Sequence, residues 1–520
     1  MESGRGDLPL SRRGVEFTFP ARAGRQTNTA NRGPPLSIVR AGAVLALLLS
    51  TVTPLAAQNT ATGAATGEIT VKQYDDGGVY EGTFRDGLQH GRGTYRLPNG
   101  FEYSGDWIEG EIRGQGIARY PNGSVYEGEF VAGKPQGFGK ITFADGATYE
   151  GDWTDGRMEG TGRAAYANGV VYQGGFLDGR HHGQGVMESP GGYRYDGDWD
   201  SGVKQGRGRI TYSDGATYDG DMLRGERAGQ GTLRMPDGRV YVGAWKEGEI
   251  NGLGRLEWPN GDAYEGLFVD GQRYGTGRLT YANGDVYDGG FAADVRAGQG
   301  TLTFADGTVY SGTWVAGELS GQGRVQYSDG AVYEGGFRDG LADGHGRITY
   351  ADGSTYEGQW TAGVISGTGR AQYANGLVYE GEFRDGVQHG RGTMTYTDGY
   401  RYDGDWQGGE RHGQGTATYA DGTVYTGGFV NGQREGRGEI LRPDGFRYEG
   451  GWLRGEIHGQ GTATYPNGDI YEGTFVQGRR EGEGTVRYVS GEVASGTWQN
   501  GLLTSATTTD ASESGDTGSD

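Results

Sequence analysis

Aromatic residues and glycines alternate with charged residues along most of this chain. In Tyr379-Glu380-Gly381-Glu382-Phe383, the rings and the glycine fall on one side of an extended chain and the carboxylates on the other. This period of two residues predicts β-strands. The frequent glycines argue against helices, because each glycine costs about 1 kcal/mol in a helix interior. We therefore predict an all-β fold.

The pattern returns every 23 residues without insertion or deletion. Tyrosine stands at residue 80 and at every twenty-third residue through 471, and Ala494 begins a truncated nineteenth unit. We number the positions of each unit 1 to 23 from this tyrosine. Glycine fills positions 3, 12, 14 and 21 of all eighteen complete units, and position 5 is Phe or Trp except at Met222. So short and regular a period predicts an elongated array in which each unit contacts only its neighbours.

Each unit is predicted to be a β-hairpin, and the units together one long twisted antiparallel meander sheet. The Asx-Gly pair at positions 20 and 21 is typical of a tight turn between units, and a three-residue loop there places positions 12 and 14 opposite positions 5 and 3 of the next unit. A four-residue loop at positions 8 to 11 would place position 5 opposite 14 and position 1 opposite 18. In that register the position-5 ring lies over two glycines, and Asp152 faces Arg163 across the sheet.

Composition and charge narrow the chemistry. There is no cysteine among the 520 residues, which excludes disulfides, a thiolate nucleophile and Cys-ligated metals. Residues 1–57 carry seven Arg against three acidic residues, so the total charge of −21 leaves −25 for the remainder. A body this acidic should repel nucleic acid, and we predict no nucleic-acid partner.

The amino-terminal residues resemble an export signal. Arg40 precedes an apolar run over 41–52, and small residues at 54–57 predict cleavage near Ala57-Gln58. A signal of this kind predicts that the protein is exported, either to the periplasm or out of the cell. After export it would be either associated with the envelope or free in solution. The alternative is an uncleaved anchor. The polar stretch before Arg40 is long for such a signal, which suggests a start site near Val39.

The predicted organisation is therefore a leader at 1–57, a linker at 58–67, the array at 68–503 and a disordered acidic tail at 504–520.

No cluster in the sequence predicts catalysis, a cofactor or a metal site. Five histidines share position 11 of their units, but equivalent positions lie two strands apart, roughly 9.6 Å, too far to share a zinc ion. Acidic residues at position 2 have the same spacing, which favours a solvated face over a catalytic pair. We expect the protein not to be an enzyme. The five histidines are His90, His182, His389, His412 and His458.

The rings at positions 1 and 5 should share one face of the sheet, as a row larger than a soluble monomer normally exposes. Either the curl of the sheet, a second copy or a ligand must cover it. We predict that the following rings line a binding face: Trp107, Trp153, Trp199, Trp245, Trp314, Trp360, Trp406, Trp452, Trp498, Tyr126, Tyr149, Tyr333, Tyr356 and Tyr379.

The alternation of Trp and Phe at position 5 slips at Phe268 and Phe291, and Asp294 there replaces the usual glycine of position 8. This slip indicates either growth by duplication of paired units or a local bend or partner contact. Asp294 would adopt a left-handed conformation less readily than glycine.

The unit resembles the MORN (membrane occupation and recognition nexus) repeat. The segment from Tyr379 to Gly399 matches that family's pattern almost letter for letter, and the resemblance covers residues 74–501. It implies a twisted sheet of hairpins with an aromatic-lined groove, in proteins that act as scaffolds, dimerise, tether membranes or are proposed to bind phospholipid headgroups.

For this chain we expect a bacterial-type, exported, non-enzymatic scaffold that binds a protein partner or a second copy, as a homodimer, through the aromatic face. The alternative is binding of membrane lipid or envelope glycan in the same groove. The charge of −25 and only five lysines count against anionic lipid.

Overall fold

The computed structural model describes residues 67–507, and every regular element within that range is a β-strand. No helix in this range is long and apolar enough to cross a membrane. The predicted leader and the residues from 508 onward lie outside the described residues. The strand β39 continues to Thr507, four residues into the segment that the sequence assigns to a tail.

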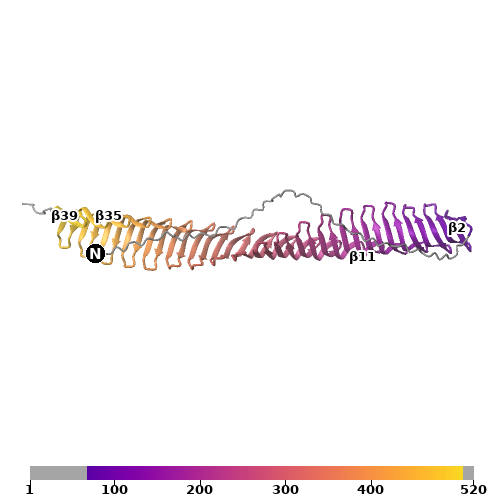
Figure 1. The fold of residues 1–520 in the computed structure, drawn as a ribbon, viewed down its shortest axis with the longest axis horizontal. Coiled ribbons are helices and arrows are strands. Elements are labelled where there is room, and N and C mark those ends of the chain that lie inside the picture. Colours follow the sequence, from indigo (N-terminus) through magenta and orange to yellow (C-terminus); the bar gives the residue numbers. More distant parts are fainter. Residues whose placement is uncertain (1–66, 508–520) are drawn as a thin grey trace, which may run out of the picture. The chain divides into compact units, whose positions relative to one another are not determined.

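The described residues form two compact units, one ending at Gln272 and the other beginning at Arg273. Within each unit, consecutive strands pair antiparallel with their neighbours in chain order, which confirms the predicted all-β meander of hairpins (Figure 1).

The strands of the first unit are β1 (Thr70–Gln73), β2 (Val79–Arg85), β3 (Leu88–Arg96), β4 (Glu102–Ile108), β5 (Glu111–Arg119), β6 (Val125–Val131), β7 (Lys134–Thr142), β8 (Thr148–Thr154), β9 (Arg157–Ala165), β10 (Val171–Leu177), β11 (Arg180–Glu188), β12 (Arg194–Asp200), β13 (Val203–Thr211), β14 (Thr217–Leu223), β15 (Glu226–Arg234), β16 (Val240–Lys246), β17 (Glu249–Glu257) and β18 (Ala263–Val269).

The next strand starts at the boundary, and those after it belong to the second unit: β19 (Gln272–Thr280), β20 (Val286–Ala292), β21 (Val295–Thr303), β22 (Val309–Val315), β23 (Glu318–Gln326), β24 (Val332–Arg338), β25 (Leu341–Thr349), β26 (Thr355–Thr361), β27 (Val364–Gln372), β28 (Val378–Arg384), β29 (Val387–Thr395), β30 (Arg401–Gln407), β31 (Glu410–Thr418), β32 (Val424–Val430), β33 (Gln433–Leu441), β34 (Arg447–Leu453), β35 (Glu456–Thr464), β36 (Ile470–Val476), β37 (Arg479–Arg487), β38 (Val493–Gln499) and β39 (Leu502–Thr507).

The turn inside each hairpin has two residues, at positions 7 and 8, and not four at 8 to 11. In the hairpin of β12 and β13, Ser201 and Gly202 both have positive φ, 51° and 87°. Two left-handed residues match the right-handed twist of the flanking strands, which is why this turn is favoured in hairpins. The predicted register within the unit is therefore wrong: Tyr195 lies opposite Ile210, so position 1 pairs with 16.

A bulge follows from this register. Gly197 pairs with Gly208 and Trp199 with Lys204, so three residues of β13 oppose the single Asp198. Gly206 in the bulge has a φ of 73°, which explains the invariant glycine at position 12. The predicted pairing of Asp152 with Arg163 is also wrong, because Glu150 occupies the place opposite Arg163.

The turn between units agrees with the prediction. Gly192 is left-handed, with a φ of 86°, and closes a three-residue loop by donating its N–H to the carbonyl of Ser189. The two strands that this turn connects pair as predicted, with Gly183 opposite Trp199 and Gly185 opposite Gly197.

The core lies on one face of the sheet, where the position-1 tyrosines other than Tyr310 lie flat over glycines 3 and 14 of their own units. A Cβ atom on Gly208 would come within 2.4 Å of the Tyr195 ring, and one on Gly197 within 2.5 Å of the Gly208 Cα. The glycines therefore make room for the tyrosine, and not for the position-5 ring as the sequence suggested. Tyr195 is fully buried and donates its hydroxyl to the carbonyl of Asp198 at 2.8 Å.

Candidate interaction surfaces

The fourteen rings predicted to line a binding face lie in the core. The exposed fractions of the nine tryptophans are 3–6%, and those of the five tyrosines are at most 1%. The rings come together as an edge-to-face ladder: Trp199 packs against Tyr195 of its own unit at 5.1 Å and against Tyr172 of the preceding unit at 5.4 Å. Their predicted contact with a partner therefore gains no support from exposure.

Each tryptophan also links its unit to the one before it. The Trp199 Nε1–H donates to the carbonyl of Gly185, in the preceding unit, at 3.0 Å. The same bond, from position 5 to position 14 of the preceding unit, is made by all nine tryptophans of this row. A buried indole N–H needs such a partner, so this row stabilises the contact between neighbouring hairpins.

A row of half-buried side chains closes over the rings. We call it the seam, and it consists of the side chains at positions 10, 18 and 22. Across it, the Tyr166 hydroxyl bonds to His181 Nε2 at 2.8 Å, and Arg411 bonds to the hydroxyl of Tyr400. Positions 10 and 18 lie at opposite ends of the strands, roughly 25 Å apart if the strands were straight. They meet because each hairpin bends around its rings, so the curl of the sheet itself covers the aromatic face.

Several seam positions carry cations that stack on tryptophan. The guanidinium carbons of Arg227, Arg296, Arg434 and Arg480 lie 4.1–4.4 Å from the centroid of the position-5 indole of the next unit. Each also donates an Nη2–H to the glycine carbonyl in the next hairpin turn, at 2.6–3.0 Å. Stacking of this kind contributes about 0.5–2 kcal/mol, so these cations hold adjacent hairpins together.

Burial shifts the proton affinities of seam and core groups. It lowers the pKa of His181 to about 4, because the half-buried ring, stacked on Tyr172 with centroids 3.6 Å apart, is shielded from solvent and its charged form is disfavoured. It raises the pKa of Tyr172, Tyr218 and Tyr241 to about 12. At neutral pH all these groups are therefore uncharged.

The slip in the Trp and Phe alternation coincides with two local departures, both in the second unit. Asp294 is left-handed, with a φ of 68°, and it is held by Arg273, whose backbone N and Nε donate to its Oδ1 at 3.0 Å each. Tyr310 leaves the ladder: its ring packs on Phe304 at 5.3 Å, and the buried Leu319 approaches Gly312 in its place. No sequence signal marks Tyr310, which has the same residue type as the other position-1 rings.

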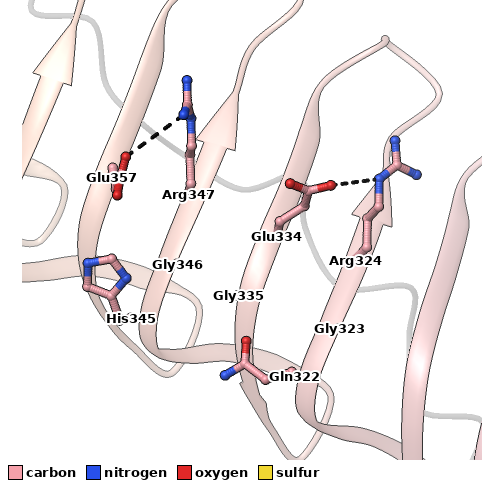
Figure 2. A pocket seen from close by; sticks show the side chains of 9 residues that line it. All are labelled: Gln322, Gly323, Arg324, Glu334, Gly335, His345, Gly346, Arg347 and Glu357. Carbon is pink, nitrogen blue, oxygen red and sulfur yellow. Dashed lines mark hydrogen bonds and ion pairs between the residues drawn. The ribbon is translucent and has the colours of Figure 1, made fainter.

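The opposite, outer face of the sheet is polar and accessible. Figure 2 shows part of it, where Arg324 pairs with Glu334 at 3.1 Å and Arg347 with Glu357 at 3.9 Å. Glycines 323, 335 and 346 form the floor of a shallow depression beside these pairs, with Gln322 and His345 at its other side (Figure 2). Ion pairs this exposed contribute about 0–1 kcal/mol each, so this face is available without disturbing the fold.

Carboxylates at position 4 have a structural role that the sequence did not indicate. Asp198 Oδ2 accepts the backbone N–H of Arg207, in the bulge, at 2.8 Å, and Asp221, Asp405 and Asp106 make the equivalent bond. An unpaired N–H in the bulge is thereby satisfied. Within residues 67–507, no group of three or more potential ligand side chains is arranged to hold a metal ion.

These features define a class of protein: an open array of antiparallel β-hairpins whose rings and glycines build the core. The family described as MORN repeat matches this chain in eighteen consecutive segments, and the chain belongs to it. The matched residues are 80–101, 103–125, 126–148, 149–171, 172–192, 195–217, 218–238, 241–263, 264–286, 287–309, 310–332, 333–355, 356–378, 379–399, 402–424, 425–447, 448–470 and 471–493.

Curated relatives share only a short stretch. Alsin of Rattus norvegicus is 48% identical over 52 residues, and Alsin of Homo sapiens is 44% identical over 52 residues. The match covers 9% of this chain and 3% of Alsin in each case.

Among solved structures, the SAS-4 TCP domain of Drosophila melanogaster, in complex with a proline-rich motif of Ana2, is 20% identical. The alignment covers 30% of this chain and 85% of that domain, with a TM-score of 0.20. A streptogramin B lyase is 11% identical over 56% of this chain and 90% of its own, with a TM-score of 0.11.

Proposed function

We propose that this chain is a non-enzymatic, exported repeat scaffold that binds protein partners through the outer face of its hairpin array. Membership of the MORN family supports a scaffold role in protein or membrane interaction. The observation that carries the choice of face is burial: the aromatic rings are enclosed by the seam, whereas the charged outer face is exposed.

Binding of lipid or glycan in an aromatic groove is the less favoured alternative. Acyl chains or sugar rings would reach the tryptophans only if the seam separated. That separation would break the stacking of Arg227, Arg296, Arg434 and Arg480 on the indoles.

Site-specific photocrosslinking in producing cells tests the choice of face. Benzoylphenylalanine is placed at Gln322 or His345 on the outer face, and at Phe304 or Tyr350 in the seam as matched controls. We expect discrete protein adducts from the two outer positions and none from the seam. Adducts from the seam alone, or lipid or glycan adducts there, would refute the proposal.

Export rests on the apolar run 41–52 and the small residues before Gln58. The test is fractionation of a bacterial host that produces the full chain, followed by amino-terminal sequencing of the product. We expect a mature protein that begins at Gln58 outside the cytoplasm. An uncleaved cytoplasmic product would contradict export without affecting the scaffold proposal.

A further inference from the structure

The outer face of β16–β18 carries apolar residues at positions where most units carry polar ones. Val242 is the one aliphatic residue at position 2 and Leu267 the one leucine at position 4. Position 13 has Leu253, and Phe138 is the one other large apolar residue at that position. Three separate departures from the polar pattern thus fall on three consecutive strands of the first unit.

The register brings these side chains together. Leu253 lies directly opposite Leu267. Val242 lies opposite Arg255, which is two residues after Leu253 on the same face of β17. Ala244 extends the group, because its Cβ lies within 2.8 Å of the Cβ that Gly252 would carry. Directly opposed residues have Cβ atoms about 5 Å apart, and diagonal neighbours about 7–8 Å, within reach of long side chains. Leu253 therefore lies beside Leu267 and within reach of Val242, and these side chains form one apolar patch.

The patch has no structural role within its unit. The exposed fractions are 71% for Leu253 and 50% for Val242. Ala244 and Leu267 beside them are half-buried. The rings of this region lie on the other face, and the units with Gln or Asp at the same positions fold in the same register. A single exposed leucine needs no explanation, but a group of accessible apolar residues with a polar rim is typical of an interaction site.

The surrounding charge identifies the partner. Between Val240 and Asp270 there are six acidic residues, of which Asp262 lies in the seam on the opposite face; the other five stand against Lys246 and Arg255, a net −3. Arg255 is already paired, with Glu257 at 2.9 Å and Glu265 at 3.8 Å. A second copy would bring the same acidic rim to the interface, and like charges repel. A partner with an apolar centre and basic flanks would match both the apolar patch and its acidic surroundings.

We propose that the patch formed by Val242, Ala244, Leu253 and Leu267 docks an apolar segment of a protein partner that is flanked by Lys or Arg. The proposal rests on the proposed scaffold function and names its partner class and one place on the outer face where that class binds.

The test uses substitutions that the array itself supplies. Val242→Glu, Leu253→Gln and Leu267→Asp install the residues found at the same positions in Glu81, Gln230 and Asp221, so the triple variant should keep the fold. The single variant Leu253→Gln serves if the triple variant does not fold. Phe138→Gln, at the same position in another hairpin, is the matched control.

The probes are two labelled peptides of equal length and charge, one alternating Lys and Leu and the other alternating Lys and Ser. Binding to the full chain is measured by fluorescence polarisation at physiological salt. We expect the Lys–Leu peptide to bind at least tenfold more tightly than the Lys–Ser peptide. That difference should disappear in the triple variant and persist in Phe138→Gln.

Equal binding of the two peptides, or a difference that survives the triple substitution, would overturn the proposal. A loss of self-association in the triple variant, seen by light scattering, would overturn it by assigning the patch to a second copy. If either of these results overturns the patch proposal while Gln322 and His345 still crosslink to proteins, the proposed scaffold function stands. Absence of those crosslinks refutes the scaffold function separately.

Discussion

Replacement of a position-14 glycine by alanine should destabilise its hairpin through one contact. In Gly208→Ala the new methyl group would lie 2.4 Å from Tyr195 Cε2 and 2.6 Å from its hydroxyl. Carbon atoms normally approach to about 3.5–4.0 Å, so the ring must move by about 1 Å. The ring is fully buried and packed against Trp199, with centroids 5.1 Å apart, so it has little space to move into.

Overpacking of this kind costs about 1–3 kcal/mol. A cost of about 2 kcal/mol corresponds to a roughly 30-fold increase in the open population. Hydrogen exchange followed by mass spectrometry is the suitable assay, because a long array does not unfold in a single step. We expect amides of β12–β14 to exchange roughly 30-fold faster, and amides several hairpins away to be unchanged.

The control is Gly191→Ala, at a turn position without a positive φ and with no atom within 4 Å of the new methyl group. It should leave exchange unchanged. In a Tyr195→Ala background the ring is absent, so Gly208→Ala should then cost less than about 0.5 kcal/mol. Equal exchange in Gly208→Ala and Gly191→Ala, or an undiminished cost in the Tyr195→Ala background, would refute the assignment of this glycine to the tyrosine ring.

Three further predictions concern single groups. Asp294→Ala should destabilise the hairpin of β20 and β21 by about 1–2 kcal/mol, because it loses the two bonds that the carboxylate accepts from Arg273 while the residue stays left-handed. Asp294→Gly should cost less in the same exchange assay, and a greater cost for Gly would contradict the strain argument. The lowered pKa of His181, about 4 against an ordinary 6.5, means that the folded state excludes a proton that the unfolded state binds. Stability near β11 should therefore be complete above pH 6.5 and decline as the pH falls to 4, and His181→Met, the residue of Met158, should abolish that decline. The pKa of Tyr172, Tyr218 and Tyr241 is raised to about 12, so the pH dependence of stability has the opposite direction. Their contribution to the free energy of unfolding is complete below pH 10 and is lost as the pH rises to 12. Phenolate absorbance and loss of β circular dichroism should therefore appear together. Phenolate absorbance at pH 10 from all the tyrosines of the array would contradict their burial.

The sequence predicted the period, the hairpins and the register between units, because the Asx-Gly turn has few alternative geometries. The predicted register inside the unit was wrong for an identifiable reason. The pair at positions 7 and 8, such as Asp178-Gly179, is itself a two-residue turn signal, but the following polar residues suggested a longer loop. The pattern alone suggests that the invariant glycine at position 12 leaves room for a ring, whereas Gly206 is required there by its positive φ.

The face of the rings was also predictable, but their accessibility was not. Alternation places Trp199 and Tyr195 on one side of the sheet. It does not state how far each hairpin bends, and that bend decides whether His181 can reach Tyr166 across the seam. The Tyr310 ring lies outside the ladder and Leu319 approaches Gly312 in its place, a packing arrangement with no counterpart in the repeat pattern.

The pairing of each hairpin with its immediate neighbours in chain order has a mechanical consequence. Tension applied across the strands of either unit would load one ladder of hydrogen bonds at a time, as in opening a zipper, because antiparallel bonds run perpendicular to the strands. Each released repeat of 23 residues would add roughly 75 Å of contour length. The protein would then behave as a tether that lengthens in equal steps under load and shortens again by refolding one hairpin after another.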